Sequence, residues 1–75
     1  MSSETVLEKV FRQAANDPLF RRRIIDQPGI ALSEEGFVLS DEEMRTVRAH
    51  LEPLRNASDR EINERVRAIA LSYRH

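Results

Sequence analysis

The chain has 75 residues, of which 40% are hydrophobic and 33% charged, and its net charge at pH 7 is −1. A chain of this length forms one domain, residues 1–75, and buries only about 60% of the surface that it exposes when unfolded. We therefore expect a core of one thin layer between helices, of the kind that a partner often completes. The near-zero net charge gives no long-range attraction to nucleic acid or to a membrane, so neither is expected as a partner.

The chain contains no cysteine, which excludes disulfides, cysteine-zinc sites and thiol nucleophiles and fits a reducing cytosol. No apolar run approaches the roughly 20 residues of a membrane-spanning helix. The N-terminus also lacks the basic and then apolar pattern of a signal peptide. We therefore expect a cytoplasmic protein.

The first predicted helix runs from the N-terminus to Asn16. We expect Ser2 or Ser3 to cap its start, with Glu4 in its first turn, where the helix dipole favours a negative charge. The helix ends at Asn16 because the residue before Pro18 is driven out of the helical conformation. Apolar residues recur every three to four positions, as on one face of a helix; they are Val6, Leu7, Val10, Phe11 and Ala14.

The second and third predicted helices both begin at a proline. Asp17 is expected to cap the second helix, with Pro18 at its first position, where a missing N–H costs nothing. The third helix begins at Pro28, has one or two turns, and ends at Gly36, since glycine readily adopts the left-handed conformation that follows a helix. In the second helix the inward-facing residues are expected to be Leu19, Phe20, Ile24 and Ile25, and the outer face is expected to consist of Arg21, Arg22 and Arg23.

A short extended link of Phe37, Val38 and Leu39 follows the third helix. Phe37 and Leu39 are expected to point into the core, with Val38 partly exposed. Ser40 and Glu43 form a capping box that starts the fourth helix. The expected buried residues of that helix are Met44, Val47, Leu51 and Leu54, and Pro53 is expected to bend or end it.

A second capping box, Ser58 with Glu61, starts the fifth predicted helix. Its expected apolar stripe is Ile62, Val66, Ile69 and Tyr73. No segment shows the alternating pattern of a strand, so the predicted fold class is all-α, a compact array of about five short helices. The aromatic residues expected to fill the core of this array are Phe11, Phe20, Phe37 and Tyr73.

No group of residues predicts an active site. His50 and His75 do not stand at a metal-ligand spacing such as i and i+4 on one helix. The sequence also contains a cluster of acidic residues, which consists of Glu34, Glu35, Asp41, Glu42 and Glu43. Most of these residues are explained by the start of a helix, where a negative charge is favourable. The cluster lacks the alternating oxygen ligands of a calcium-binding loop. We therefore predict no catalytic residue, no metal and no cofactor, and a protein that is not an enzyme.

Two surfaces are candidates for partner binding. The first is the run Arg21, Arg22 and Arg23, which fans over about 200° of the helix and so cannot form one tight patch by itself. Nucleic acid would require more basic residues and a recognition helix, so contact with an acidic protein fits better. Charge reversal of the run is expected to weaken partner binding while leaving helicity intact. The second surface is the link Gly36, Phe37, Val38 and Leu39, together with Ile30 and the apolar end of the fifth helix.

The central segment resembles the pattern of a known family of helical modules. In that pattern an apolar helix precedes Asp-Pro with an aromatic residue and arginine, a second X-Pro, Ala-Leu, and then Gly-apolar-X-Leu-Ser with acidic residues. The matching residues are Asp17, Pro18, Phe20, Arg21, Pro28, Ala31, Leu32, Gly36, Phe37, Leu39, Ser40, Asp41 and Glu43. The resemblance covers roughly residues 5 to 55. It is to the module shared by nitrile-hydratase-like leader peptides of ribosomally made, post-translationally modified peptide precursors and the small alpha chain of LigAB-type extradiol dioxygenases.

The resemblance implies a function in recognition. In the leader-peptide members, including borosin-type binding domains held by an N-methyltransferase, a modifying enzyme binds the module while a C-terminal core peptide is processed. In the dioxygenase, a related chain packs over the catalytic subunit. The implied function is thus a non-catalytic domain that docks on a modifying enzyme, with two alternatives: an accessory subunit of a larger catalytic subunit, or a stand-alone helical adaptor, either monomeric or a homodimer.

The sequence departs from the family pattern at two places. Gln27 stands where the pattern repeats Asp before proline, which affects only a helix cap. No Gly-Gly or similar cleavage site and no tail rich in Ser, Thr or Cys follows the fifth predicted helix. We therefore expect either a leader domain alone or a stand-alone recognition or accessory subunit.

Overall fold

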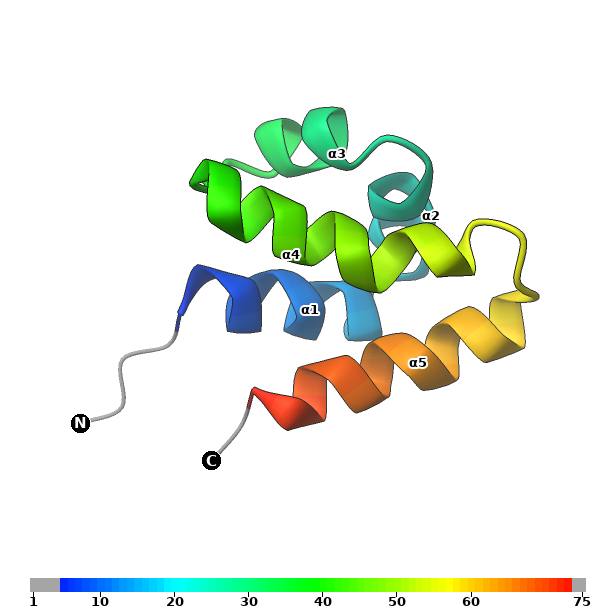
Figure 1. Cartoon of the computed structure of the whole chain (residues 1–75). Helices are drawn as coiled ribbons and strands as arrows, with labels where there is room; N and C mark the ends of the chain where they lie inside the picture. Colours follow the sequence, from blue (N-terminus) through cyan, green and yellow to red (C-terminus); the bar gives the residue numbers. More distant parts are fainter. Residues whose placement is uncertain (1–4, 74–75) are drawn as a thin grey trace.

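The computed structural model describes residues 5–73, which fold into an all-α array of five helices (Figure 1). The helices are α1 (Val6–Asn16), α2 (Pro18–Asp26), α3 (Pro28–Glu34), α4 (Asp41–Leu51) and α5 (Asp59–Ser72), and one 3-10 turn, η1 (Glu52–Leu54), follows α4. No strand occurs within residues 5–73, so the predicted fold class is confirmed. None of the helices in this segment has the length and apolar character needed to cross a membrane.

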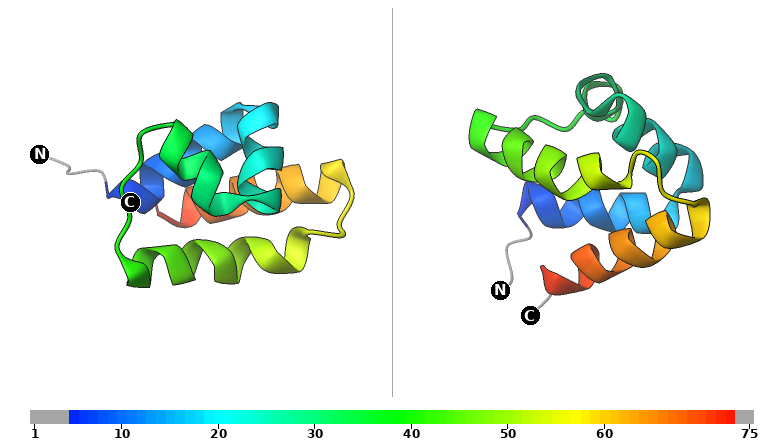
Figure 2. Two further views of the ribbon diagram at one scale, coloured as in Figure 1. Left: turned by 90° about the horizontal axis from the view of Figure 1, so that it is seen from above. Right: turned by 45° about the vertical axis from the view of Figure 1, so that its right-hand side comes forward.

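Helix α1 lies in the middle of the array (Figure 1). It contacts α2, from which one residue separates it, and α5, which comes last in the chain. In Figure 1, α4 lies above α1 and α5 lies below it, whereas the view from above in Figure 2 shows both toward the same side of α1. Helix α3 lies beside α2. Because α5 runs antiparallel to α1, the start of α5 lies beside the end of α1 (Figure 1).

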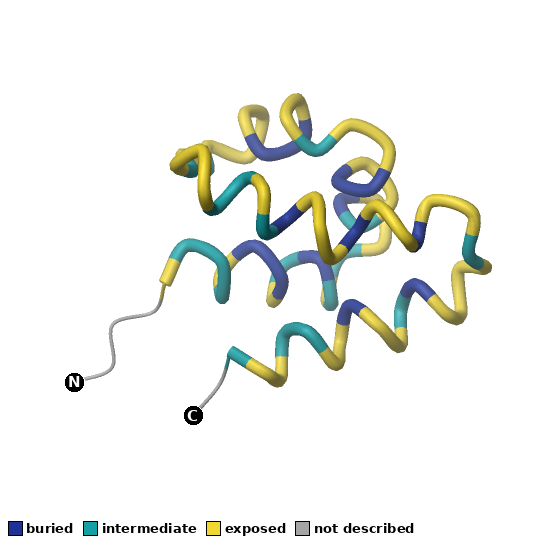
Figure 3. The backbone as a smooth tube through the Cα atoms, in the orientation of Figure 1, coloured by how far each residue is buried: buried dark blue, intermediate teal, exposed yellow. Residues whose placement is uncertain are grey.

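Apolar side chains from every helix form the core, and no polar or charged residue of the described segment is buried. Helix α1 contributes Val10, Phe11 and Ala14, each with 0% exposure. The other buried residues are Phe20, Ile24, Ile25, Ala31, Leu32, Val47, Leu51, Leu54, Ile62 and Val66. They follow the inner side of each helix, whereas the outer sides are exposed (Figure 3). The core is thus a single layer of side chains around α1, as expected for a short chain.

Aromatic contacts join the helices around α1. The ring of Phe11 stacks on that of Tyr73 at a centroid distance of 5.7 Å, and it meets the ring of His50 on α4 nearly at right angles at 5.6 Å. The ring of Phe20 on α2 lies 6.1 Å from that of Phe37, which follows α3. All four aromatic residues expected in the core lie in it or pack against it. His50 is exposed, but its ring also contacts the core residue Phe11.

Side-chain caps set the starts of three helices where the sequence predicts them. Asp17 caps α2, with Pro18 at the first helical position. Ser40 caps α4, and Glu43 completes the capping box. Ser58 caps α5 by accepting a hydrogen bond from the amide of Glu61, which is one half of the predicted capping box; the second bond, from the Ser58 amide to the Glu61 side chain, is not formed. The Asp-Pro and Ser-x-x-Glu patterns therefore located these helix starts correctly.

The start of α1 differs from the prediction. Its cap is Thr5, whose hydroxyl oxygen accepts a hydrogen bond from the amide of Glu8 at 3.1 Å. Ser2, Ser3 and Glu4, which we expected at the cap and in the first turn, lie outside the described residues. Threonine is itself a favourable cap residue, and here it stands directly before the apolar stripe of the helix, which is the usual position of a cap.

Helix α4 ends at the position predicted from Pro53. The helix stops at Leu51 and the chain continues as the single turn η1, because proline cannot donate the next helical hydrogen bond. Of the residues expected to be buried along this segment, Val47, Leu51 and Leu54 are buried and Met44 is partly buried against the core.

The link between α3 and α4 is held at both ends. Gly36 has a φ of 81°, and the amides of Gly36 and Phe37 donate hydrogen bonds back to the last turn of α3 at 3.1 and 2.9 Å. This pair of bonds is a Schellman motif. Phe37 and Leu39 pack against the core, whereas Val38 is 88% exposed. The expected alternation along the link is therefore confirmed.

Helix α2 buries three of the four residues expected to face inward and differs from the prediction at two positions. Leu19, expected to face inward, is 78% exposed, and Arg21, expected on the outer face, is half-buried. The buried residues of α2 are Phe20, Ile24 and Ile25. At about 100° per residue, the centre of this stripe lies roughly 160° from Leu19 and roughly 40° from Arg21. The prediction is wrong for these two residues because hydrophobicity alone does not fix the angle of a short helix.

The positive φ of Gly36 gives a test of the link. No atom lies within 4 Å of the position that a Cβ would take, so Gly36→Ala adds only backbone strain, and we expect it to lower the free energy of unfolding by about 1 to 2 kcal/mol. Gly29→Ala is the control, because Gly29 lies inside α3 with equally open space; there we expect a gain of about 0.4 to 1 kcal/mol. Urea denaturation followed by circular dichroism measures both. Equal effects of the two substitutions would contradict the strained conformation.

Candidate partner-binding surface

Arg21 binds the end of α1. Its Nη1 atom donates hydrogen bonds to the carbonyl oxygens of Ala14 and Ala15, at 3.0 and 3.2 Å. In a continuous helix the carbonyl of Ala14 would accept from the amide four residues later, but that residue is Pro18, which has no N–H. The guanidinium group replaces the missing donor and places a positive charge at the negative end of the α1 dipole. Helix α1 has no basic residue in its own last turn, so Arg21 supplies this charge from the next helix.

The side chains of Arg22 and Arg23 extend from α2 in two other directions. The Nε atom of Arg22 lies 3.5 Å from the carboxylate of Asp26, and its Nη1 atom lies 3.9 Å from that of Asp59 on α5. Arg23 forms an ion pair with Glu34 on α3. These side chains are half exposed or more, so each pair contributes only about 0 to 1 kcal/mol. The three arginine side chains of the run therefore contact three different helices, α1, α5 and α3, and do not form one basic face.

A groove open to solvent lies between the α1–α2 junction and the first half of α5. It consists of two adjoining hollows of about 370 and 470 Å³ that share Pro18, Arg21 and Asp59. The remaining lining residues are Ala15, Asn16, Arg22, Arg60, Ile62, Asn63 and Arg67. Four of these ten residues are arginines, and Asp59 is the one acidic residue among them. We call this surface the arginine groove.

Sequence reasoning found two of the groove's arginines and missed the other two. Arg60 and Arg67 lie on α5 with Asn63 between them, at the spacing i, i+3 and i+7 that places three residues on one face of a helix. This stripe is visible in the sequence. Its proximity to Arg21 and Arg22 is not, because that depends on the way α5 crosses α1.

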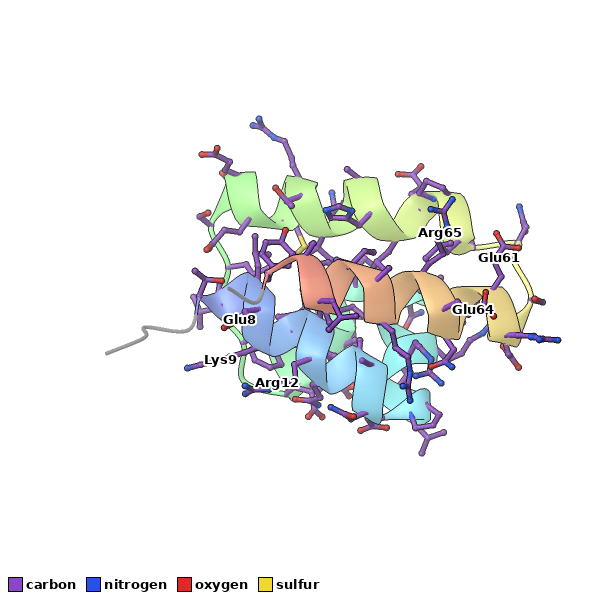
Figure 4. All side chains as sticks on the ribbon, turned by 90° about the horizontal axis from the view of Figure 1, so that it is seen from below. Glu8, Lys9, Arg12, Glu61, Glu64 and Arg65 are labelled. Carbon is purple, nitrogen blue, oxygen red and sulfur yellow. The ribbon has the colours of Figure 1, made fainter. Side chains whose placement is uncertain are left out.

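Side chains of α5 are oriented by contacts within the helix. The Nε atom of Arg67 donates to the Oδ1 atom of Asn63 at 3.2 Å, which leaves the amide NH₂ group of Asn63 as a hydrogen-bond donor. The Nε atom of Arg60 lies 3.6 Å from the carboxylate of Glu64. Figure 4 shows Glu64 on α5, with Arg65 extending from the side of α5 that faces away from α1. The basic residues of α5 therefore divide between two faces, and Arg60 and Arg67 belong to the groove.

The second predicted surface, the link, lies at the other end of the array from the arginine groove (Figure 1). There Val38 is 88% exposed, and Ile30 on the preceding helix α3 is 53% exposed. Leu71 near the end of α5, also an expected candidate, is 64% exposed. The structure therefore does not bring the arginine run and the link together into one site.

The acidic residues have structural partners. Glu34 pairs with Arg23, and Glu35 accepts a hydrogen bond from the Nε2 atom of Gln13 at 2.6 Å. Glu43 completes the capping box of α4. Within residues 5–73, no group of three or more His, Cys, Asp or Glu is arranged to hold a metal ion. These contacts give three of the five acidic residues roles in the fold, and Asp41 and Glu42 lie in the first turn of α4, where the helix dipole favours a negative charge.

Comparison with protein-family models, with curated proteins and with solved structures found no significant match. The relation to leader domains and to small dioxygenase chains therefore rests on the sequence pattern alone. The surfaces of the chain that bear on its function are the link with its exposed Val38 and the arginine groove.

Proposed function

We propose that the chain is a non-catalytic recognition domain that docks on a cytoplasmic peptide-modifying enzyme, as leader domains of modified-peptide precursors do. Two observations support this. The pattern from Asp17 to Glu43 resembles that of leader domains. The link from Gly36 to Leu39 presents an apolar residue, Val38, on a backbone that is fixed on both sides. The second observation is the one on which the proposal depends.

Val38 has the properties of a docking residue. Its apolar side chain is 88% exposed, so a partner that covers it gains the free energy of apolar burial. Its neighbours Phe37 and Leu39 anchor the link in the core, and the Schellman motif and the capping box hold its two ends. Binding here does not require a loop to become ordered, and that ordering is one of the main costs of association.

Val38→Glu is expected to abolish capture of the enzyme while the fold remains intact. A carboxylate costs the free protein little at an exposed position, but at an apolar interface it must lose its water. The tagged chain would be used to capture proteins from a lysate of the organism that encodes it, with identification by mass spectrometry. Leu19→Glu is the matched control, because it makes the same chemical change at a residue that is 78% exposed on α2.

The identity of the captured protein decides between the alternatives. A peptide-modifying enzyme recovered with the wild-type chain and with Leu19→Glu, but not with Val38→Glu, supports the proposal. Recovery of an extradiol-type iron dioxygenase would instead assign the chain as an accessory subunit. A homodimer without a captured enzyme, detected by sedimentation, would indicate a stand-alone adaptor. Either of these last two results overturns the leader-like function.

A further inference from the structure

We propose that the arginine groove is a docking site for an acidic segment of a partner protein, whose aspartate or glutamate side chains it binds. This inference names the chemistry of the partner and so rests on the proposed function. It uses a different surface from Val38, at the other end of the array (Figure 1). Four arginines and one aspartate line the groove, so its charge is complementary to carboxylates.

The start of α5 adds to the positive potential of the groove. Helices α2 and α5 begin there, at Pro18 and Asp59. The carboxylate of Asp17 already accepts hydrogen bonds from the first amides of α2 and compensates the positive end of that helix. The start of α5 is capped by the neutral hydroxyl of Ser58, so this helix end is the one that contributes positive potential. The negative end of α1 also lies at the groove, but the guanidinium group of Arg21 covers its carbonyl oxygens. The four arginine side chains therefore supply most of the attraction for an anion, and the start of α5 adds to it.

The existing ion pairs of the groove are weak enough to be exchanged. The side chain of Arg60 is 90% exposed and pairs with Glu64 on the same helix at 3.6 Å. Arg22 lies 3.9 Å from Asp59, whose side chain is 97% exposed. Such exposed pairs contribute little to stability, whereas a guanidinium group can bind an incoming carboxylate through two parallel N–H bonds. The amide of Asn63 adds a neutral donor beside Arg67.

The charge of the whole chain favours a short protein segment over nucleic acid as the occupant. The chain has 13 acidic and 12 basic residues, so a long polyanion would meet repulsion beyond the groove. The acidic start of α4, Asp41 to Glu43, lies at the far end of the array (Figure 1). Nucleic acid gains affinity mainly from many phosphate contacts, whereas a segment with a few carboxylates needs only the groove.

Fluorescence polarisation of the whole chain with a fluorescein-labelled octa-glutamate peptide tests the inference. We expect binding that weakens when salt rises from about 0.1 M to about 1 M, because the Debye length falls from about 10 Å to about 3 Å. An octa-glutamine peptide is expected not to bind. The double variant Arg60→Gln with Arg67→Gln is expected to bind octa-glutamate about fivefold more weakly.

The matched control is the double variant Arg45→Gln with Arg65→Gln. It removes the same net charge from two exposed arginines that do not line the groove, and Arg65 extends from another side of α5 (Figure 4). Unchanged octa-glutamate binding in this control supports the groove, whereas equal weakening in both double variants overturns it. Tighter binding of an oligothymidylate of equal charge overturns the choice of a protein partner.

The two proposals fail separately. Octa-glutamate binding is measured without the enzyme, so its absence overturns the groove and not the docking at Val38. An affinity for the captured enzyme that is unchanged in the Arg60→Gln with Arg67→Gln variant but lost in Val38→Glu would likewise overturn the groove and retain the docking at Val38. Conversely, peptide binding at the groove together with capture of a dioxygenase would overturn the proposed function and retain the groove.

Discussion

Phe11→Ala is expected to lower the free energy of unfolding by about 3 to 5 kcal/mol. The side chain of Phe11 is fully buried, and its ring contacts His50 on α4 and Tyr73 after α5. Truncation would open a cavity where three helices meet. A domain of this size has a total stability of only about 5 kcal/mol, so the variant should be largely unfolded at moderate urea concentrations. Urea denaturation followed by circular dichroism measures the change.

Leu19→Ala is the control for Phe11→Ala. It also removes apolar atoms, but Leu19 is 78% exposed, so we expect a change within about 0.5 kcal/mol. Phe20→Ala is expected to behave like Phe11→Ala, since Phe20 is only 4% exposed. If Phe11→Ala and Leu19→Ala had the same denaturation midpoint, the core around α1 would be assigned wrongly.

Local signals in the sequence predicted most of the helix boundaries. Asp17 before Pro18, Ser40 before Glu43, and Gly36 each set a boundary through bonds to residues a few positions away. Such bonds depend on neighbouring residues and hardly on the rest of the fold. These boundaries are therefore readable from one sequence without knowledge of the tertiary structure.

The orientation of the helices was less predictable. Leu19 is exposed and Arg21 is half-buried, because the buried stripe of α2 consists of Phe20, Ile24 and Ile25. A helix of nine residues has only about two and a half turns, so the sequence fixes its inner face only roughly, and packing against α1 and α3 sets the final angle. The arginine groove depends on the same packing, since Arg60 and Arg67 come from a helix that is distant in sequence from α2.

Most of the residues that resemble the leader-domain pattern either set the backbone or belong to the core. Asp17 caps a helix, Pro18 and Pro28 occupy first helical positions, and Gly36 has the positive φ that follows a helix. The pattern therefore specifies a fold, and proteins with different partners can share it. The function has to be tested on what the fold displays, which is Val38 on the link and the arginine groove.

Arg21→Ala is expected to lower the free energy of unfolding by about 1 to 2 kcal/mol. The change removes the hydrogen bonds to the carbonyl oxygens of Ala14 and Ala15. Hydrogen bonds to a charged group contribute about 1.5 to 3 kcal/mol, and water partly replaces them at this half-buried site. Arg22→Ala and Arg23→Ala are matched controls with half-exposed side chains, where we expect at most about 1 kcal/mol. Thermal and urea unfolding of the three variants gives the comparison.

Arg21→Lys separates charge from geometry. Lysine keeps a positive charge near the end of α1 but lacks the planar guanidinium group, so its stability should fall between those of the wild-type chain and Arg21→Ala. Charge reversal of all three arginines would disturb the end of α1 as well as any partner contact. Reversal of Arg22 and Arg23 with Arg21 retained is therefore the variant that tests partner binding by the run. If the Arg21→Ala protein were as stable as the wild type, the hydrogen bonds of Arg21 would not stabilise the end of α1. Charge reversal of all three arginines would then change only the surface charge.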